Sequence, residues 1–238
     1  MNFKSLIKKL RTSRAASLAV LIDPDKFNPQ LIHLANKSKV SCFLVGGSKL
    51  AKGDVNKTVL AIKKISRIPV ILFPGDETQL SKAADGLLLL SLLSGRNPDY
   101  LIEKHITAAP IIKKMKLDYL STAYLLIDGG TMSVTQQVTK TIPLDPANKA
   151  YIVNTAIAAE QLGFKAIYLE AGSGAKKNIA SPLIKQIKKE ITLPLIVGGG
   201  IDSRKKVTEV IKAGANMIVI GNALEKNVYL LTEISSCF

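Results

Sequence analysis

The sequence of 238 residues predicts an α/β protein in which eight parallel strands, with helices between them, close into one (β/α)8 barrel. Eight short apolar segments recur along the chain, amphipathic helical patterns separate most of them, and the length suits one barrel of this kind. An open doubly wound sheet is the alternative, but it favours a Gly-x-Gly-x-x-Gly turn after the first strand, which is absent here. No Pro/Gly/Ser-rich linker divides residues 1–238, so we expect a single domain.

The first half of the chain supplies four expected strands. Each is a continuous apolar run, as a parallel strand buried on both faces requires: Ala19–Ile22, Cys42–Val45, Val70–Phe73 and Gly86–Leu90. A helix with Val55, Val59 and Ile62 on one face is expected between the second and third strands. Only about a dozen residues separate the third strand from the fourth, too few for a full crossover helix. We therefore expect an irregular segment and an open flank in place of the helix that would follow the third strand.

The fifth strand, Ala123–Ile127, is flanked by less regular segments. A longer helical pattern before it follows Asn97-Pro98, and Pro110 predicts a break or kink because proline removes a helical hydrogen bond. The polar stretch Thr131–Thr141 has no clear helical period, which is typical of a lid or binding loop at a barrel rim. Asp145-Pro146 is expected to start the next helix.

The last three expected strands all end in glycine-bearing turns, in Tyr168–Gly174, Ile196–Gly200 and Val219–Asn222. Glycine allows positive φ and a close approach to a ligand, and successive backbone N–H groups form an anion-binding concavity. In such barrels phosphate commonly binds beyond strands seven and eight. Ordinary strand-to-helix turns explain any one of these stretches equally well, but the three together favour a phosphate site.

Polar side chains also follow the first two strands. Asp23 emerges where its carboxylate could hold a divalent cation, and the hydroxyl of Ser48 ends the second strand at the equivalent position. Asp25 is expected to cap a helix or to face solvent. Glu170 could orient a substrate hydroxyl or take its proton. These residues indicate a transferase or isomerase acting on a phosphorylated polyol, with Mg²⁺ if a diphosphate takes part.

The formal charge of +15 predicts an affinity for anions, although many lysines fall on solvated helix faces. Nucleic acid is excluded as an expected partner, because aromatic residues are scarce and no recognition motif is present. Cys42 and Cys237 fit no metal or redox spacing and indicate a reducing compartment. Met1–Arg11 predicts a short amphipathic helix rather than a signal peptide. A cytoplasmic protein is therefore expected.

Several of these motifs resemble those of the geranylgeranylglyceryl phosphate and heptaprenylglyceryl phosphate synthases. The likeness runs from about Leu18 to about Asn222 and rests on five stretches: Asp23-Pro24-Asp25-Lys26, Gly46-Gly47-Ser48, Tyr168-Leu169-Glu170-Ala171-Gly172-Ser173-Gly174, Val197-Gly198-Gly199-Gly200-Ile201 and Gly221-Asn222. The resemblance implies a prenyltransferase that joins sn-glycerol 1-phosphate to a long polyprenyl diphosphate, with geranylgeranyl diphosphate the expected donor. The product would be an ether, and diphosphate would leave.

The resemblance also implies roles for particular residues. Asp23 and Ser48 would contact Mg²⁺. On chemical grounds Glu170 and Asp23 are the catalytic candidates, with a purely binding carboxylate as the alternative for Glu170, and Lys26 either assists the diphosphate or faces solvent. Glycerol phosphate would be held by Tyr168, Leu169, Glu170, Ala171, Gly172, Ser173, Gly174, Gly199, Gly200, Gly221 and Asn222. The family's barrel lacks a regular third helix, and an apolar groove for the prenyl tail would run along that side.

The sequence is also compatible with two other functions. A phosphosugar isomerase or synthase on the same barrel would share the glycine turns but would not need Asp23 with Ser48 and a metal. A basic barrel that only docks on an anionic membrane is the non-enzymatic alternative. Large apolar helix faces predict a homo-oligomer, either a dimer or a hexamer, and the basic surface is compatible with peripheral membrane contact.

Overall fold

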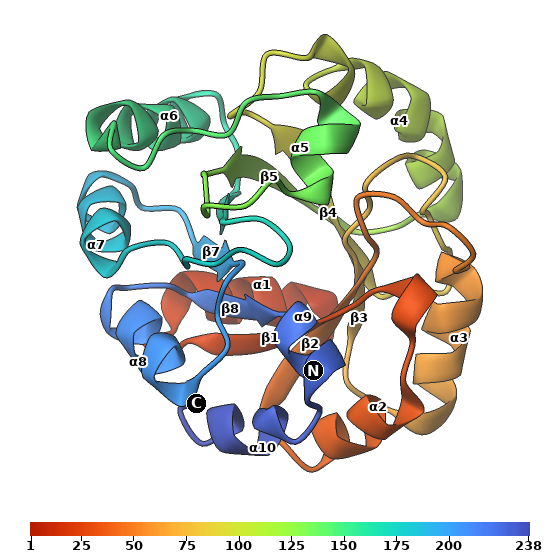
Figure 1. Cartoon of the computed structure of the whole chain (residues 1–238). Helices are drawn as coiled ribbons and strands as arrows, with labels where there is room; N and C mark the ends of the chain where they lie inside the picture. Colours follow the sequence, from red (N-terminus) through yellow and green to blue (C-terminus); the bar gives the residue numbers. More distant parts are fainter.

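A computed structural model describes all 238 residues and contains the predicted closed (β/α)8, or TIM, barrel (Figure 1). All eight neighbouring strand pairs are parallel, and β1 closes the cylinder by pairing with β8. The strands are β1 (Ser17–Ile22), β2 (Val40–Val45), β3 (Val70–Leu72), β4 (Gly86–Leu92), β5 (Tyr119–Leu126), β6 (Ala166–Glu170), β7 (Leu195–Gly198) and β8 (Met217–Ile220).

Ten helices surround or close the cylinder. They are α1 (Phe3–Thr12), α2 (Pro29–Asn36), α3 (Val55–Ile65), α4 (Glu103–Met115), α5 (Val134–Thr139), α6 (Lys149–Gln161), α7 (Ser181–Glu190), α8 (Arg204–Lys212), α9 (Asn222–Lys226) and α10 (Leu230–Ser235). Short 3-10 turns cover Pro24–Lys26 and Pro98–Tyr100. No helix combines the length and the apolarity that crossing a bilayer requires.

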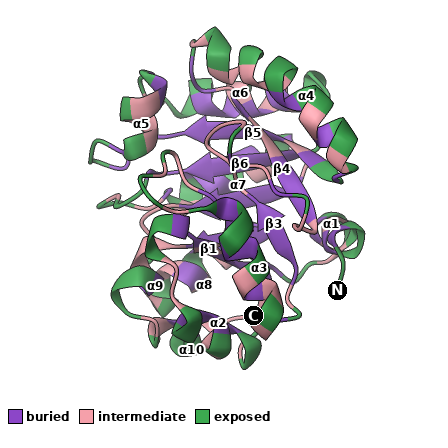
Figure 2. Cartoon of the chain, turned by 90° about the vertical axis from the view of Figure 1, so that its right-hand side faces the viewer, coloured by how far each residue is buried: buried purple, intermediate pink, exposed green.

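The core has two layers, which follow from the alternation of side chains along each strand. One side of the strands packs against the surrounding helices, and the other fills the barrel interior. Figure 2 shows the buried strands between helices whose outer faces are exposed. The amphipathic helix α1 lies at one end of the barrel, where Phe3, Leu6 and Leu10 join the interior core.

No helix follows β3, as the sequence predicts. Residues 73–85 run as an irregular segment from β3 to β4. The ring of helices therefore has a gap between α3 and α4.

Three sequence-based expectations about helices are wrong. The Thr131–Thr141 stretch is not all loop: it contains α5, where the Ser133 hydroxyl caps the helix by accepting the backbone N–H of Gln136. Helix α4 runs unbroken through Pro110, although the proline lacks an N–H to donate to a helical carbonyl. Helix α6 begins at Lys149 rather than at Asp145-Pro146, because Asp145 instead accepts the Ala147 N–H within a turn.

Candidate active site

A cavity of about 480 Å³ opens at the carboxyl ends of the strands, where (β/α)8 barrels carry their active sites. Its wall combines the loops after β1, β2, β6, β7 and β8. Most residues predicted for the site line it: Asp23, Lys26, Ser48, Tyr168, Glu170, Ser173, Gly174, Gly199, Gly200, Gly221 and Asn222.

Three predicted binding residues do not line this cavity. Leu169 and Ala171 are buried in the core between strands and helices, because strand alternation turns them away from Tyr168 and Glu170. Gly172 uses its backbone N–H to hydrogen-bond the Glu170 carboxylate at 2.8 Å. These three residues therefore lie behind the residues that line the cavity, and Gly172 fixes the position of the Glu170 carboxylate.

Glu170 ends β6 and is the one acidic residue buried in the protein, with 7% of its surface exposed. Burial raises its pKa to about 7, because desolvation disfavours the charged form. The hydrogen bond from Gly172 and the adjacent Tyr168 hydroxyl oppose this shift. A carboxyl group that titrates near neutrality can hold or accept a proton at physiological pH.

Tyr168 lies beside Glu170 with a fully buried ring. Its hydroxyl has no hydrogen-bond partner in the protein, although it lines the cavity. Burial and the nearby carboxylate raise the pKa of Tyr168 well above its ordinary value, so the hydroxyl stays protonated. The protonated hydroxyl lies beside the Glu170 carboxyl group at the wall of the cavity.

The glycine turns surround this carboxyl group. Gly199 and Gly200 have φ of +81° and +68°, a backbone conformation that glycine adopts without strain. The backbone N–H groups of Ser173, Gly174, Gly199 and Gly200 donate to no acceptor within the protein. Residues with unpaired backbone donors around one cavity are suited to binding an anion such as phosphate.

A chain of polar contacts joins the two sides of the cavity. The Ser173 hydroxyl donates to Oδ1 of Asn222 at 2.9 Å, and Nδ2 of Asn222 donates to Oε2 of Glu225 at 3.3 Å. The same Oε2 accepts from Nζ of Lys26 at 2.8 Å. Glu225 was not singled out from the sequence, because nothing marks a carboxylate within a short helix as part of a site.

Asp23 and Ser48 lie on the β1 and β2 side of the cavity. Burial raises the pKa of Asp23, while a hydrogen bond from the Asp25 N–H and the charge of Lys26 oppose the rise. The hydroxyls of Ser48 and Thr135 are 2.7 Å apart. No group of three or more His, Cys, Asp or Glu side chains is placed to hold a metal ion. One carboxylate and one hydroxyl suit Mg²⁺, which commonly uses one or two carboxylates together with substrate phosphates and water.

Asp25 is exposed, which is one of the two alternatives that the sequence predicted, and it does not cap a helix. Its carboxylate accepts the backbone N–H groups of Ala51, Lys52 and Gly53 in the loop after β2. These bonds lower the pKa of Asp25. Asp25 therefore holds the loop that follows Ser48.

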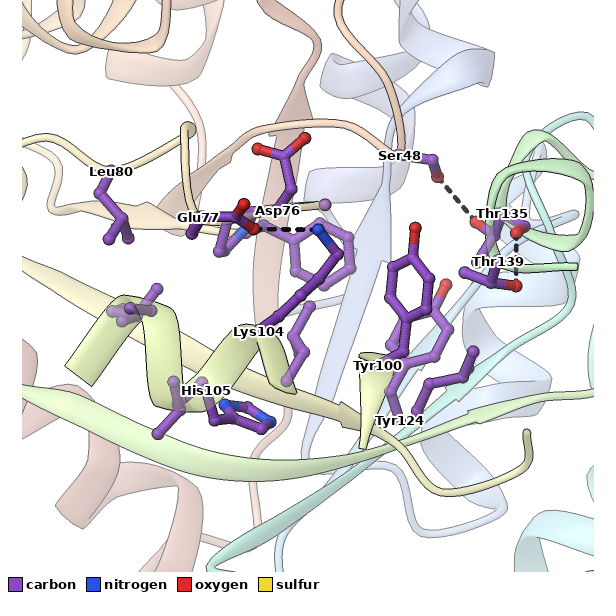
Figure 3. A pocket seen from close by; sticks show the side chains of 18 of the residues that line it. Ser48, Asp76, Glu77, Leu80, Tyr100, Lys104, His105, Tyr124, Thr135 and Thr139 are labelled. Carbon is purple, nitrogen blue, oxygen red and sulfur yellow. Dashed lines mark hydrogen bonds and ion pairs between the residues drawn. The ribbon is translucent and has the colours of Figure 1, made fainter. Parts of the chain in front are cut away.

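A second, apolar cavity of about 110 Å³ adjoins the first on the side without a helix. It lies between β4, α4 and the irregular segment, with Leu80, Leu87, Leu89 and Ala108 in its wall. Figure 3 shows Lys104 facing Glu77, at an Nζ to Oε2 distance of 2.9 Å. An apolar cavity therefore lies on the flank where a groove was expected.

Aromatic side chains separate the two cavities. Phe73 and Tyr124 line both. Tyr124 stacks on Tyr168 with ring centroids 5.3 Å apart, and Phe73 lies 5.1 Å from the Tyr168 ring. From the sequence, Phe73 and Tyr124 were expected only as strand residues. Their position between the cavities could not be predicted, because it depends on residues distant in the chain meeting at the rim.

Comparison with known proteins places this arrangement among related barrels. The PcrB family profile matches residues 10–236. The chain is 39% identical over 236 residues to a geranylgeranylglyceryl phosphate synthase of Spirosoma linguale, covering 98% of this chain and 95% of that protein. The corresponding protein of Flavobacterium johnsoniae is 45% identical over 214 residues, with 88% of each chain covered.

A solved structure shares the whole fold. It is the (S)-3-O-geranylgeranylglyceryl phosphate synthase of Thermoplasma acidophilum in complex with its substrate sn-glycerol-1-phosphate. The TM-score is 0.90 at 29% sequence identity, and the alignment covers 100% of this chain and 98% of that one.

Proposed function

This chain belongs to the PcrB family, and from that premise we propose that it is a prenyltransferase joining sn-glycerol 1-phosphate to a polyprenyl diphosphate. The observation that best supports this proposal is that two cavities adjoin and share part of their lining. One is polar, with unpaired N–H groups and a buried carboxyl group, and the other is apolar. The polar part suits a phosphorylated polyol and the apolar part suits a hydrocarbon tail. A phosphosugar isomerase would have no use for the apolar part.

The glycerol phosphate would bind next to Glu170. Its phosphate would accept hydrogen bonds from the N–H groups of Gly199, Gly200 and Ser173, and its hydroxyls would meet Tyr168 and Glu170. These contacts hold the primary hydroxyl in one direction, and such orientation lowers the entropic part of the barrier.

In the reaction a C–O bond forms between this hydroxyl oxygen and the allylic carbon of the donor. The bond from that carbon to diphosphate breaks, and diphosphate leaves with the electron pair. The hydroxyl proton goes to the Glu170 carboxylate, whose pKa of about 7 allows it to accept a proton. The aromatic side chains between the cavities keep water away from the reacting carbon.

The other side of the polar cavity would hold the diphosphate. Asp23 and Ser48 would bind Mg²⁺, which neutralises charge on a departing diphosphate. Nζ of Lys26 lies 4.0 Å from Oδ2 of Asp23 and adds a positive charge on the same side of the cavity. Geranylgeranyl diphosphate is the donor that we propose, with its tail in the apolar cavity.

Turnover tests this proposal directly. Purified protein would be incubated with sn-glycerol 1-phosphate, Mg²⁺ and polyprenyl diphosphates of increasing length, and the extracted lipids would be weighed by mass spectrometry. We expect an ether product of the mass of glycerol phosphate plus one prenyl group. Binding of glycerol phosphate without product from any donor would refute the prenyl transfer.

We also propose that the protein self-associates through α4. Ile102 and Ile106 lie one helical turn apart and are 59% and 60% exposed. Sedimentation velocity of the wild type and of Ile106→Asp would test this. A monomer in both cases would contradict it.

A further inference from the structure

The irregular segment between β3 and β4 is tied to its neighbours by polar side chains. Ser81 donates its hydroxyl to Oδ1 of Asn56 at 2.7 Å, and Asp85 pairs with Lys63 at 2.7 Å. The second oxygen of Asp85 accepts the N–H of Val70 at 2.8 Å. The segment thus has a defined path without forming a helix.

Gln79 in this segment makes the most specific of these contacts. It is 2% exposed, and both ends of its amide bind the backbone of a single residue, Gly47. The Gly47 N–H donates to Oε1 at 3.1 Å, and Nε2 donates to the Gly47 carbonyl at 2.8 Å. The last backbone hydrogen bond between β2 and this segment is donated by the Phe73 N–H to the Val45 carbonyl. The Gln79 side chain therefore supplies hydrogen bonds where backbone pairing has ended.

The backbone around Gly47 is packed too closely for side chains. A Cβ on Gly46 would lie 2.1 Å from the Phe73 carbonyl oxygen, and one on Gly75 would lie 2.3 Å from the Gly47 carbonyl oxygen. The loop has no side chain of its own with which to fix its peptides at this point. Its hydrogen bonds to Gln79 fulfil that task.

Gly47 stands between the two proposed Mg²⁺ ligands. The position of a Cβ at Gly47 is 3.9 Å from Oδ1 of Asp23, and Ser48 is the next residue in the chain. A rotation of the Gly47 peptide would therefore turn the Ser48 hydroxyl and change its distance from the Asp23 carboxylate.

We propose that Gln79 is a positioning residue for the diphosphate end of the reaction, acting through the peptide of Gly47 on Ser48. This inference rests on the proposed prenyl transfer. Gln79 has no contact with the glycine turns after β6, β7 and β8, so the two substrates should respond differently to its loss.

Three variants test this role. Gln79→Met keeps the length of the side chain and removes both hydrogen bonds. Gln79→Glu keeps an acceptor for the Gly47 N–H and, when ionised, cannot donate to the carbonyl. Ser81→Ala is the matched control, because Ser81 is equally buried in the same segment but bonds Asn56 instead of Gly47.

The measurements separate the two substrates. For both Gln79 variants we expect kcat/KM for the prenyl diphosphate to fall roughly 10- to 100-fold, with more Mg²⁺ needed for half-maximal rate. The Kd for glycerol 1-phosphate, measured by calorimetry, should stay within about twofold, since the sites are separate. The calorimetric stoichiometry counts the folded protein, so each rate is expressed per binding-competent molecule. Ser81→Ala should retain wild-type kinetics.

The outcomes distinguish the positioning role of Gln79 from the proposed prenyl transfer itself. Wild-type protein without prenyl transfer would refute the proposed function itself. An active wild type with unchanged kinetics in Gln79→Met would refute the positioning role alone. A parallel loss in Ser81→Ala, or equal losses for both substrates, would assign Gln79 a general structural role and overturn the inference.

Discussion

Gly199 lies so close to Glu170 that a Cβ at position 199 would be 2.3 Å from Oε1 of the carboxylate. Glu170 is the last residue of β6, Gly199 directly follows β7, and the φ of Gly199 is +81°. The same Cβ would be 2.7 Å from the Ala171 nitrogen and 2.9 Å from the Gly172 nitrogen. The turn after β7 therefore packs directly against the buried carboxyl group, with no room for a side chain at position 199.

Gly199→Ala should abolish measurable glycerol 1-phosphate binding, because the new methyl group displaces the Glu170 carboxylate. The positive φ adds a loss of stability of about 1–3 kcal/mol. Gly163→Ala is the control: Gly163 has φ +87° but no atom within 4 Å of its Cβ position, so it has the strain without the clash. Calorimetry and urea unfolding of both variants would check this. Retained binding in Gly199→Ala would contradict the described geometry.

The charge of Glu170 should make stability depend on pH. Its pKa rises from 4.5 to about 7 on folding, so the folded protein binds more protons than the unfolded chain between these values. The free energy of unfolding should therefore fall as the pH rises through this window, by about 3 kcal/mol for this group. Glu170→Gln lacks the titration and should gain stability relative to the wild type from pH 5 to 8. Urea unfolding at several pH values measures the difference, and a constant difference would show that Glu170 ionises normally.

Mg²⁺ removal should stop turnover while leaving glycerol 1-phosphate bound. Asp23→Asn keeps the size of the side chain and its acceptor for the Asp25 N–H, but it removes the negative charge. We expect a loss of about 10²-fold in kcat/KM for the diphosphate substrate, in line with loss of a group that stabilises developing charge. Rates measured against Mg²⁺ concentration, with a chelator as the zero point, test this. Full activity of the wild type in excess chelator would rule out the metal role.

Filling the apolar cavity should shorten the usable donor. Leu89 lies on its wall, and Leu89→Trp would occupy space that the tail needs. The rate with long donors should drop, while short donors and glycerol 1-phosphate binding are retained. Leu162→Trp is the control, because Leu162 is 68% exposed and lines neither cavity. Competition assays with donors of graded length give the comparison. An unchanged length preference would mean that the tail lies elsewhere.

The barrel could be predicted because its strands are apolar runs in regular alternation with helices. The ends of these strands also located the site: Asp23, Ser48 and Glu170 each follow a buried run, and parallel topology brings such ends to one rim. The missing helix after β3 was predictable from chain length alone.

The parts that escaped prediction depend on contacts between distant residues. Gln79 is 32 residues from Gly47, and nothing local marks its amide as buried or paired. Helix α5 was missed because six residues are too few to reveal a helical period. Leu169 and Ala171 were assigned to substrate because they belong to a recognised motif, although alternation along β6 turns them to the core.

Helix α1 precedes in the chain every strand that it packs against. Its Phe3, Leu6 and Leu10 share one core with residues as distant as Ala166, Ile196 and Val219. The Phe3 ring also occupies the space beside Gly86, where a Cβ would be 2.4 Å away. These contacts need the interior of a closed cylinder, and contacts distant in sequence form slowly. Because these partners come from strands along the whole chain, α1 can bury its apolar face fully only when those strands are assembled.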